Sequence, residues 1–224
     1  MLIDVASTTV IPRDCTNRIA IIPIGSLEYH GGLLPLNTDS IISSKIIDYC
    51  ISDVDTNICL LKYPVLQYGF SPEWLSFSGT VSIDSETYKR LIYSILKSIE
   101  FNVSPLGFII VNAHGSNYYP LKSLVNEYYM ERHIPIVIID IWRIAGKYGI
   151  IYCHACELEA ELYHRFMGIE VKASNNIYCR EIDGIYTEYS VGRCGELSVS
   201  IDDFLKSICK YFGIAVETIA KHKR

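Results

Sequence analysis

The sequence contains no block of like charges and no apolar run long enough to cross a membrane. Its formal net charge is only −5 over 224 residues, which argues against nucleic acid or an anionic membrane bound by bulk electrostatics. The first residues, MLIDVASTTVIPRDC, have no basic start ahead of an apolar stretch and do not resemble a signal peptide. We therefore expect a cytoplasmic protein with neither a nucleic-acid nor a membrane partner.

Zinc-ribbon and thioredoxin patterns are also missing, although the chain has eight cysteines. Cys153 and Cys156 form the C-x-x-C sequence CHAC, but no second C-x-x-C accompanies it and its surroundings are not thioredoxin-like. In a cytosolic chain most cysteines are small buried hydrophobic residues, and we expect the same here. The alternatives are a redox role for this pair, or structural disulfides if the source is a hyperthermophile.

Repeats, low-complexity segments and linkers are absent from the sequence, which excludes a solenoid and favours a single domain over residues 1–224. Continuous apolar runs alternate with segments of helical spacing. Strands are predicted at 18–25, at 57–69 including its exit loop, at 106–115 and at 134–142. Helices are predicted at 40–51, 84–100, 119–132, 157–168 and 201–224, the last with a break at Gly213.

This alternation predicts an α/β fold whose central sheet is mostly parallel and covered by helices on both faces. Such sheets bind ligands at the carboxyl ends of their strands. Three predicted strands are followed there by acidic residues or histidines. These are Glu28, His30 and Asp39 after the first strand, His114 after the third, and His154, Glu157 and Glu159 after the fourth. We expect them to lie together at one edge of the sheet.

Each residue also has an ordinary explanation when it is taken alone. Glu28 and His30 are two apart and point to the same side of an extended segment, yet a solvated loop could equally contain them. Asp39 precedes a predicted helix and could simply cap it. It could also bridge two metal ions with its two oxygens. Glu157 and Glu159 fall on different helix faces, so that one can point inward while the other stays in solvent.

As a set, the histidines and carboxylates match a site for zinc, manganese or iron(II), which accept mixed nitrogen and oxygen ligands. There are enough of them for two divalent ions, whose chemistry is the attack of an activated water on a carbonyl. The alternative is a histidine–carboxylate acid–base pair without an ion. It is less favoured, because several carboxylates close together repel one another unless a cation compensates them.

Four segments, in this order, resemble motifs of the creatininase family. They are IPIGSLEYHGGLLPLNTD, FSGTVSI at 77–83, VNAHGSN and HACELE. The resemblance implies a three-layer α/β/α sandwich that hydrolyses C–N amide bonds of small molecules and assembles into homo-oligomers. It implies two metal ions held by Glu28, His30, Asp39, His114 and Glu159, with Asp39 as the bridge. It also implies that His154 transfers protons beside the site and that Glu157 is a supporting carboxylate outside the ligand set.

The same resemblance places substrate contacts at Ser116, Asn117 and Trp74. Creatinine-cleaving members have a glutamate at the position of Ser116, and many members have a histidine at that of Trp74. The chain departs from them at both positions. In size and motifs it is most similar to the archaeal formamidopyrimidine-nucleotide deformylase branch. This branch implies removal of a formyl group from a pyrimidine ribonucleotide in riboflavin and deazaflavin biosynthesis.

A nucleotide substrate also needs a phosphate anchor. The backbone N–H groups of 115–117, at a helix start, could provide it, and so could Arg143 or Lys147. Creatinine hydrolysis and peptide processing remain alternatives within the family. Outside it, the alternatives are a catalytically silent binding protein and a C-x-x-C redox protein.

Overall fold

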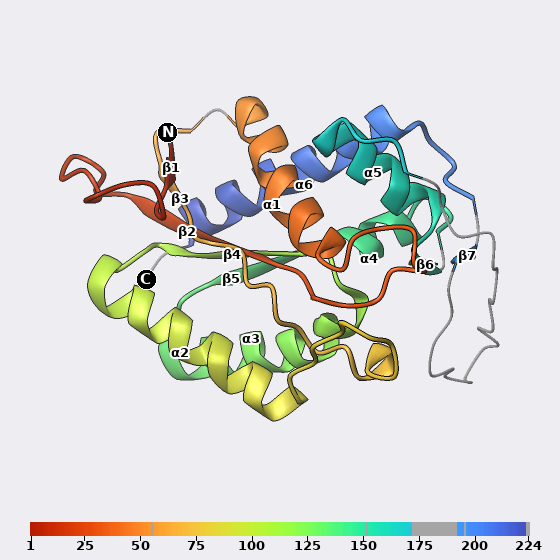
Figure 1. The fold of residues 1–224 in the computed structure, drawn as a ribbon. Coiled ribbons are helices and arrows are strands. Elements are labelled where there is room, and N and C mark those ends of the chain that lie inside the picture. The colour runs from red at the N-terminus through yellow and green to blue at the C-terminus, as the bar shows by residue number, and fades with distance from the viewer. Residues whose placement is uncertain (55, 151, 172–191, 195, 223–224) are drawn as a thin grey trace.

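A parallel five-stranded sheet forms the centre of the molecule (Figure 1). The computed structural model describes residues 1–54, 56–150, 152–171, 192–194 and 196–222. The strands are β1 (Leu2–Asp4), β2 (Arg18–Ile24), β3 (Cys59–Lys62), β4 (Gly107–Asn112) and β5 (Ile136–Asp140), in the order β1-β3-β2-β4-β5. Every neighbouring pair in this sheet is parallel, as predicted. Two short strands, β6 (Tyr152–His154) and β7 (Gly192–Cys194), pair antiparallel beside it.

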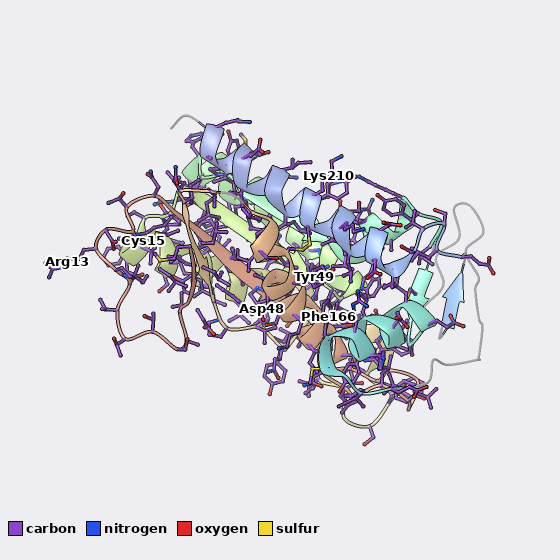
Figure 2. The ribbon with its side chains drawn as sticks, turned by 90° about the horizontal axis from the view of Figure 1, so that it is seen from above. Arg13, Cys15, Asp48, Tyr49, Phe166 and Lys210 are labelled. Carbon is purple, nitrogen blue, oxygen red and sulfur yellow. A yellow bond between two sulfur atoms is a disulfide. The ribbon has the colours of Figure 1, made fainter. Side chains whose placement is uncertain are left out.

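Helices cover both faces of the sheet and complete the expected three layers (Figure 1). One face carries α1 (Thr38–Cys50), α4 (Ile141–Gly146), α5 (Glu157–Met167) and α6 (Ile201–Lys221). The other face carries α2 (Ser85–Val103) and α3 (Tyr118–Arg132). Figure 2 views the first face from above, where the labelled rings of Tyr49 on α1 and Phe166 on α5 meet edge to face with centroids 6.2 Å apart.

The buried strands divide their side chains between two cores. In β2, Ile19 and Ile21 pack into the core beneath α1 and α6. Ala20 and Ile22 enter the core beneath α2 and α3. A strand that is buried on both faces needs apolar residues at consecutive positions, which explains the continuous run seen in the sequence.

Several element boundaries follow from local hydrogen bonds. Asp84 caps α2 by accepting from the N–H of Thr87 at 3.0 Å, and α5 closes at Gly168 with a φ of 68°. The prediction of a strand through residue 142 is wrong, because Asp140 accepts the N–H of Arg143 at 2.9 Å and begins α4.

The predicted break at Gly213 is also wrong. α6 runs without interruption from Ile201 to Lys221. Phe212, Ala215 and Val216 are buried on the core side of this helix. Packing of this stripe against the sheet outweighs the low helix propensity of one glycine.

Among the described residues, six of the eight cysteines form disulfides, so the alternative of structural disulfides holds in place of the expectation that most cysteines are only small buried hydrophobic residues. Cys15 pairs with Cys59, Cys50 with Cys209, and Cys153 with Cys156. The second pair ties α1 to α6. Cys179 lies outside the described residues. Within the described part of the chain, none of the helices is long and apolar enough to cross a membrane.

The sheet reverses its order at β2. The chain leaves β2 for β3 on one side and later reaches β4 on the other. In doubly wound sheets the crevice beyond the carboxyl ends of two such strands is where ligands bind. The segments that carry Glu28 and His114 begin at this point.

Candidate metal centre

Three segments bring the candidate ligands to the crevice between β2 and β4. Glu28 and His30 lie in the loop after β2, His114 follows β4, and Asp39 lies in the first turn of α1. Asp39 does not cap this helix, whose N-cap residue is Asn37. A Cβ at Gly25 would lie 2.3 Å from the backbone nitrogen of Ser40. Glycine is therefore required for the end of β2 to approach α1 this closely.

The ligand side chains converge within hydrogen-bonding or ion-pairing distance. His30 Nε2 lies 3.1 Å from Asp39 Oδ1. His114 Nδ1 lies 3.1 Å from Glu28 Oε1 and 3.3 Å from Asp39 Oδ2. His154 Nδ1 lies 3.5 Å from Glu28 Oε1. All of these side chains are buried, so that the residues meet in a shielded centre.

Backbone carbonyls hold the three imidazoles in place from behind. His30 Nδ1 donates to the carbonyl of Glu28 at 3.0 Å, and His154 Nε2 donates to that of Tyr29 at 2.7 Å. His114 Nε2 donates to the carbonyl of Phe70 at 2.9 Å. A carbonyl can only accept, so each imidazole keeps an N–H on that nitrogen and points its other nitrogen into the centre. This arrangement is typical of metal-binding histidines.

Asp39 belongs to two sets of potential metal ligands. In one set it lies with Glu28 and His114, and in the other with His30 and Glu159, and the ligand atoms of each set lie within 4.8 Å of one another. The N–H of Ala155 donates to Glu159 Oε2 and orients this carboxylate. The arrangement suits two ions that share Asp39. A third set consists of Glu28, His30 and His154.

The unsatisfied polar atoms support a cation in the centre. Both carboxylate oxygens of Glu28 and Oδ2 of Asp39 are buried and make no hydrogen bond of good geometry among the described residues, although His114 Nδ1 lies 3.1 Å from Glu28 Oε1 and 3.3 Å from Asp39 Oδ2. Glu159 is a third buried carboxylate, 1 % exposed. Burying charges without compensation costs several kcal/mol or more. The residues therefore fit a site for divalent ions with mixed nitrogen and oxygen ligands.

The electrostatics of the metal-free centre follow from the same burial. Burial raises the pKa of Glu159 to about 8. Burial also lowers the pKa of His154 to about 4, with the charge of His30 acting in the same direction. For His30, burial opposes the charged form, but the carboxylate of Asp39 prevails and raises the pKa to about 10. At neutral pH the metal-free protein thus holds a proton on Glu159 and an extra proton on His30, and a bound metal ion would displace both.

A buried amide network supports the loop of His114. Asn112 donates to Asp140 Oδ2 at 2.8 Å and to the carbonyl of His114 at 2.8 Å. Asn117 accepts the N–H of Phe70 at 2.9 Å and donates to the carbonyl of Gly25 at 3.0 Å. Asn117 is fully buried, so its amide shapes the loop. Its predicted contact with substrate stays a prediction.

The remaining predicted residues surround the centre at different depths. Trp74 is 1 % exposed and stacks on His154, with ring centroids 3.9 Å apart. Ser116 is half-buried and donates to the carboxylate of Glu73. Glu157 is exposed at the start of α5 and belongs to none of the three sets of potential metal ligands found among the described residues. No sequence motif pointed to Glu73, because its hydrogen-bond partner Ser116 lies in a loop that is distant in the sequence.

The two candidate phosphate anchors differ in position. The guanidinium of Arg143 lies 4.1 Å from the ring centroid of Tyr118, which directly follows the His114 loop. Lys147 instead bonds to the hydroxyl of Tyr211 on α6 at 3.0 Å. Arg143 is therefore the nearer of the two to the His114 loop.

Comparisons with known proteins identify relatives of this chain. The sequence profile of the creatininase family, described as creatinine amidohydrolase, matches residues 5–175. A mycofactocin precursor peptide peptidase from Mycobacterium ulcerans is 33% identical over 112 residues, covering 48% of this chain and 44% of that protein. The chain thus spans about half the length of the curated relatives that it matches.

Solved structures share the fold. A putative creatinine amidohydrolase from Bacteroides fragilis superimposes with a TM-score of 0.73 at 16% identity, covering 92% of this chain and 90% of that one. A mutant creatininase of the Zn–Zn type superimposes with a TM-score of 0.68 at 16% identity, covering 93% and 92%. These likenesses show the three-layer fold.

Proposed function

The chain belongs to the creatininase family, and we propose that it is a metal-dependent amidohydrolase that cleaves a C–N amide bond. The observation that carries this proposal is the sharing of Asp39 between two sets of buried ligands. Glu28, Asp39 and His114 would hold one divalent ion, and His30, Asp39 and Glu159 the other. Zinc, manganese and iron(II) all suit these ligands. When bound, such ions polarise a carbonyl and make water nucleophilic near neutral pH.

The protein's own part is to position these ligands, exclude water and move a proton. The backbone carbonyls behind the imidazoles fix their orientation, and burial keeps solvent from the centre. We assign proton transfer to His154. Its Nδ1 faces Glu28 while its Nε2–H is held by Tyr29, so Nδ1 alone can exchange a proton with the centre.

For the substrate we propose a formylated pyrimidine ribonucleotide phosphate, from which the enzyme removes formate. Two features support it. Ser116 replaces the glutamate of creatinine-cleaving members, and Arg143 lies beside the loop of His114, where a phosphate could be bound. Peptide processing is the second candidate, because relatives at 32–33% identity are named as peptide peptidases. Creatinine is the third.

The test is a parallel assay of the metal-loaded protein. Formate release from a formamidopyrimidine ribonucleotide is measured beside creatinine hydrolysis and cleavage of short peptides, each with Zn²⁺, Mn²⁺ and Fe²⁺. We expect formate release, and we expect Glu28→Gln to abolish it together with metal binding. Full activity of a metal-free preparation would contradict the metal-dependent mechanism. Activity on peptides alone would replace the substrate proposal and keep the mechanism.

Three further properties remain proposals. We propose that the protein assembles into a homo-oligomer and that residues 1–224 form a single domain. We also propose a cytoplasmic location. Three disulfides are unusual in a mesophilic cytosol but occur inside hyperthermophiles. A silent binding protein is less favoured, because all five proposed ligands are present and close together.

A further inference from the structure

The disulfide between Cys153 and Cys156 encloses two residues that touch the metal centre. His154 points its Nδ1 at Glu28 and stacks against Trp74. The N–H of Ala155 donates to the carboxylate of Glu159. The short ring that the disulfide closes therefore carries one contact to each of two candidate ligands.

The backbone inside this ring is in an uncommon conformation. Ala155 has a φ of +50°, in the left-handed region that residues other than glycine rarely adopt. Such a conformation persists only where its surroundings hold it. The disulfide bridges the residues on either side of His154 and Ala155, with Cα atoms 5.4 Å apart. Opening the bridge removes one constraint that aims the Ala155 N–H at Glu159.

The pair is also placed for reaction with a thiol. Cys153 is half-buried, whereas Cys156 is fully buried at the N-cap of the eleven-residue helix α5. A thiolate at a helix N-terminus is stabilised by the backbone N–H groups and the helix dipole. Cys156 is therefore the better leaving group, and Cys153 is the more exposed cysteine of the pair.

The other two disulfides lack this access. Cys15, Cys59, Cys50 and Cys209 are each between 0% and 7% exposed. Cys59 is the first residue of β3, so the Cys15–Cys59 pair lies at the amino ends of the strands, whereas the metal centre lies beyond their carboxyl ends. Cys15 is labelled far from α5 in Figure 2. Among the three disulfides of the described residues, the pair beside the centre has one half-buried cysteine, whereas both cysteines are buried in each of the other two pairs.

We propose that Cys153–Cys156 is a reversible redox-modification site, with a dithiol as its reaction partner, that tunes the affinity of the centre for metal. A dithiol thiolate attacks Cys153 Sγ, the S–S bond breaks, and Cys156 leaves as a thiolate. The second thiol of the partner then attacks the mixed disulfide and releases Cys153. The partner becomes a disulfide, and the protein gains two electrons and two protons. The effect on metal affinity rests on the proposed metal centre, whereas the thiol chemistry does not.

The first experiment tests the chemistry without any metal. The protein is equilibrated with mixtures of reduced and oxidised dithiothreitol, its thiols are alkylated, and mass spectrometry reports which pairs have opened. We expect Cys153–Cys156 to open at mixtures that leave Cys15–Cys59 and Cys50–Cys209 intact. Opening of all three pairs together, or only on unfolding, would overturn the proposal.

The second experiment measures Zn²⁺ affinity by competition with a chelator. Loss of a supporting contact to a ligand weakens metal binding by about 10–100-fold, and we expect a loss of this size in the double variant Cys153→Ser/Cys156→Ser. The double variant Cys15→Ser/Cys59→Ser is the matched control and should keep wild-type affinity. If a variant does not fold, the Zn²⁺ affinity is measured instead on wild-type protein whose 153–156 disulfide has been reduced and alkylated.

The outcomes separate this inference from the proposed function. If the oxidised wild type binds no Zn²⁺ at all, the proposed metal centre fails. If the oxidised protein binds Zn²⁺ and opening the 153–156 bridge leaves the affinity unchanged, the inference is wrong and the centre stands. A loss of affinity confined to the 153–156 variant and to the reduced wild type supports both.

Discussion

The charge of Glu159 at neutral pH differs between the metal-free and the metal-bound protein. Burial raises its pKa to about 8, so that it holds a proton at neutral pH in the metal-free protein. A raised carboxyl pKa contributes stability below the unfolded value of 4.5, and this contribution is lost as the pH rises through 8. A bound ion needs the carboxylate and takes the place of this proton.

We therefore expect Zn²⁺ binding at pH 7 to release protons, and the observed affinity to rise with pH through about 8, the pKa of Glu159, and on towards about 10, the pKa of His30. Titration calorimetry in buffers of different ionisation enthalpy measures the number released. Glu159→Gln should bind Zn²⁺ more weakly and release fewer protons, whereas exposed Glu157→Gln is a matched control on the same helix. A proton release that is unchanged in Glu159→Gln would contradict this assignment.

His154 is held differently from the other histidines, because an aromatic ring stacks on it and burial keeps it neutral down to a pKa of about 4. As a proton-transfer residue it should be dispensable for metal binding. We expect His154→Asn to lower kcat by about 10²–10⁴-fold while Zn²⁺ content stays at the wild-type level. Metal analysis and turnover measured on the same preparation decide this. Loss of Zn²⁺ along with turnover would make His154 a ligand, in the set that it forms with Glu28 and His30.

At the scale of elements, two glycines in helical contexts have opposite roles. Gly213 lies inside the continuous helix α6, and a Cβ there would meet no atom within 4 Å. Gly168 ends α5 with a φ of 68°, a conformation that disfavours any residue with a Cβ.

We expect Gly213→Ala to raise the free energy of unfolding by about 0.5–1 kcal/mol. Gly168→Ala should lower it by a similar amount, about 1 kcal/mol, because alanine must adopt the left-handed conformation. Chemical denaturation under non-reducing conditions measures both. If Gly213→Ala destabilises the protein, α6 is kinked at this residue and the continuous helix is incorrect.

At the scale of the whole molecule, the disulfide between Cys50 and Cys209 joins α1 to α6 across 159 residues of sequence. In the chain-entropy account a disulfide restricts the unfolded state more strongly as its loop becomes longer. The Cys153–Cys156 pair spans only three residues and restricts it little. The two pairs therefore have different consequences, one for stability and the other for the metal centre.

We expect Cys50→Ser/Cys209→Ser to lower the free energy of unfolding by about 2–5 kcal/mol. Cys153→Ser/Cys156→Ser should change it much less. Both are measured by guanidinium denaturation of the oxidised proteins. Equal losses in the two variants would show that loop length does not govern the contribution of these disulfides.

Much of the centre could be predicted from the sequence, because the rules that place it are local or topological. The period of two in a strand puts Glu28 and His30 on one side, and parallel strands end at one edge. These rules bring His114 to the same crevice without any knowledge of distances, whereas Glu159 lies on α5, after the strand β6 of the second sheet, and reaches the crevice through the packing of that helix. Element boundaries were harder to predict, because Asp140 ends β5 through a side-chain hydrogen bond that leaves no periodic signal.

The sequence by itself determined the α/β alternation, the buried strands and the set of acids and histidines at their carboxyl ends, since periodicity and residue chemistry are properties of the chain. Only the tertiary structure decided which atoms meet. The stacking of Trp74 on His154, the bond from Ser116 to Glu73 and the pairing of Cys50 with Cys209 join residues that are distant in sequence. Such partners depend on how helices pack across the sheet, and that packing is settled by the whole core at once.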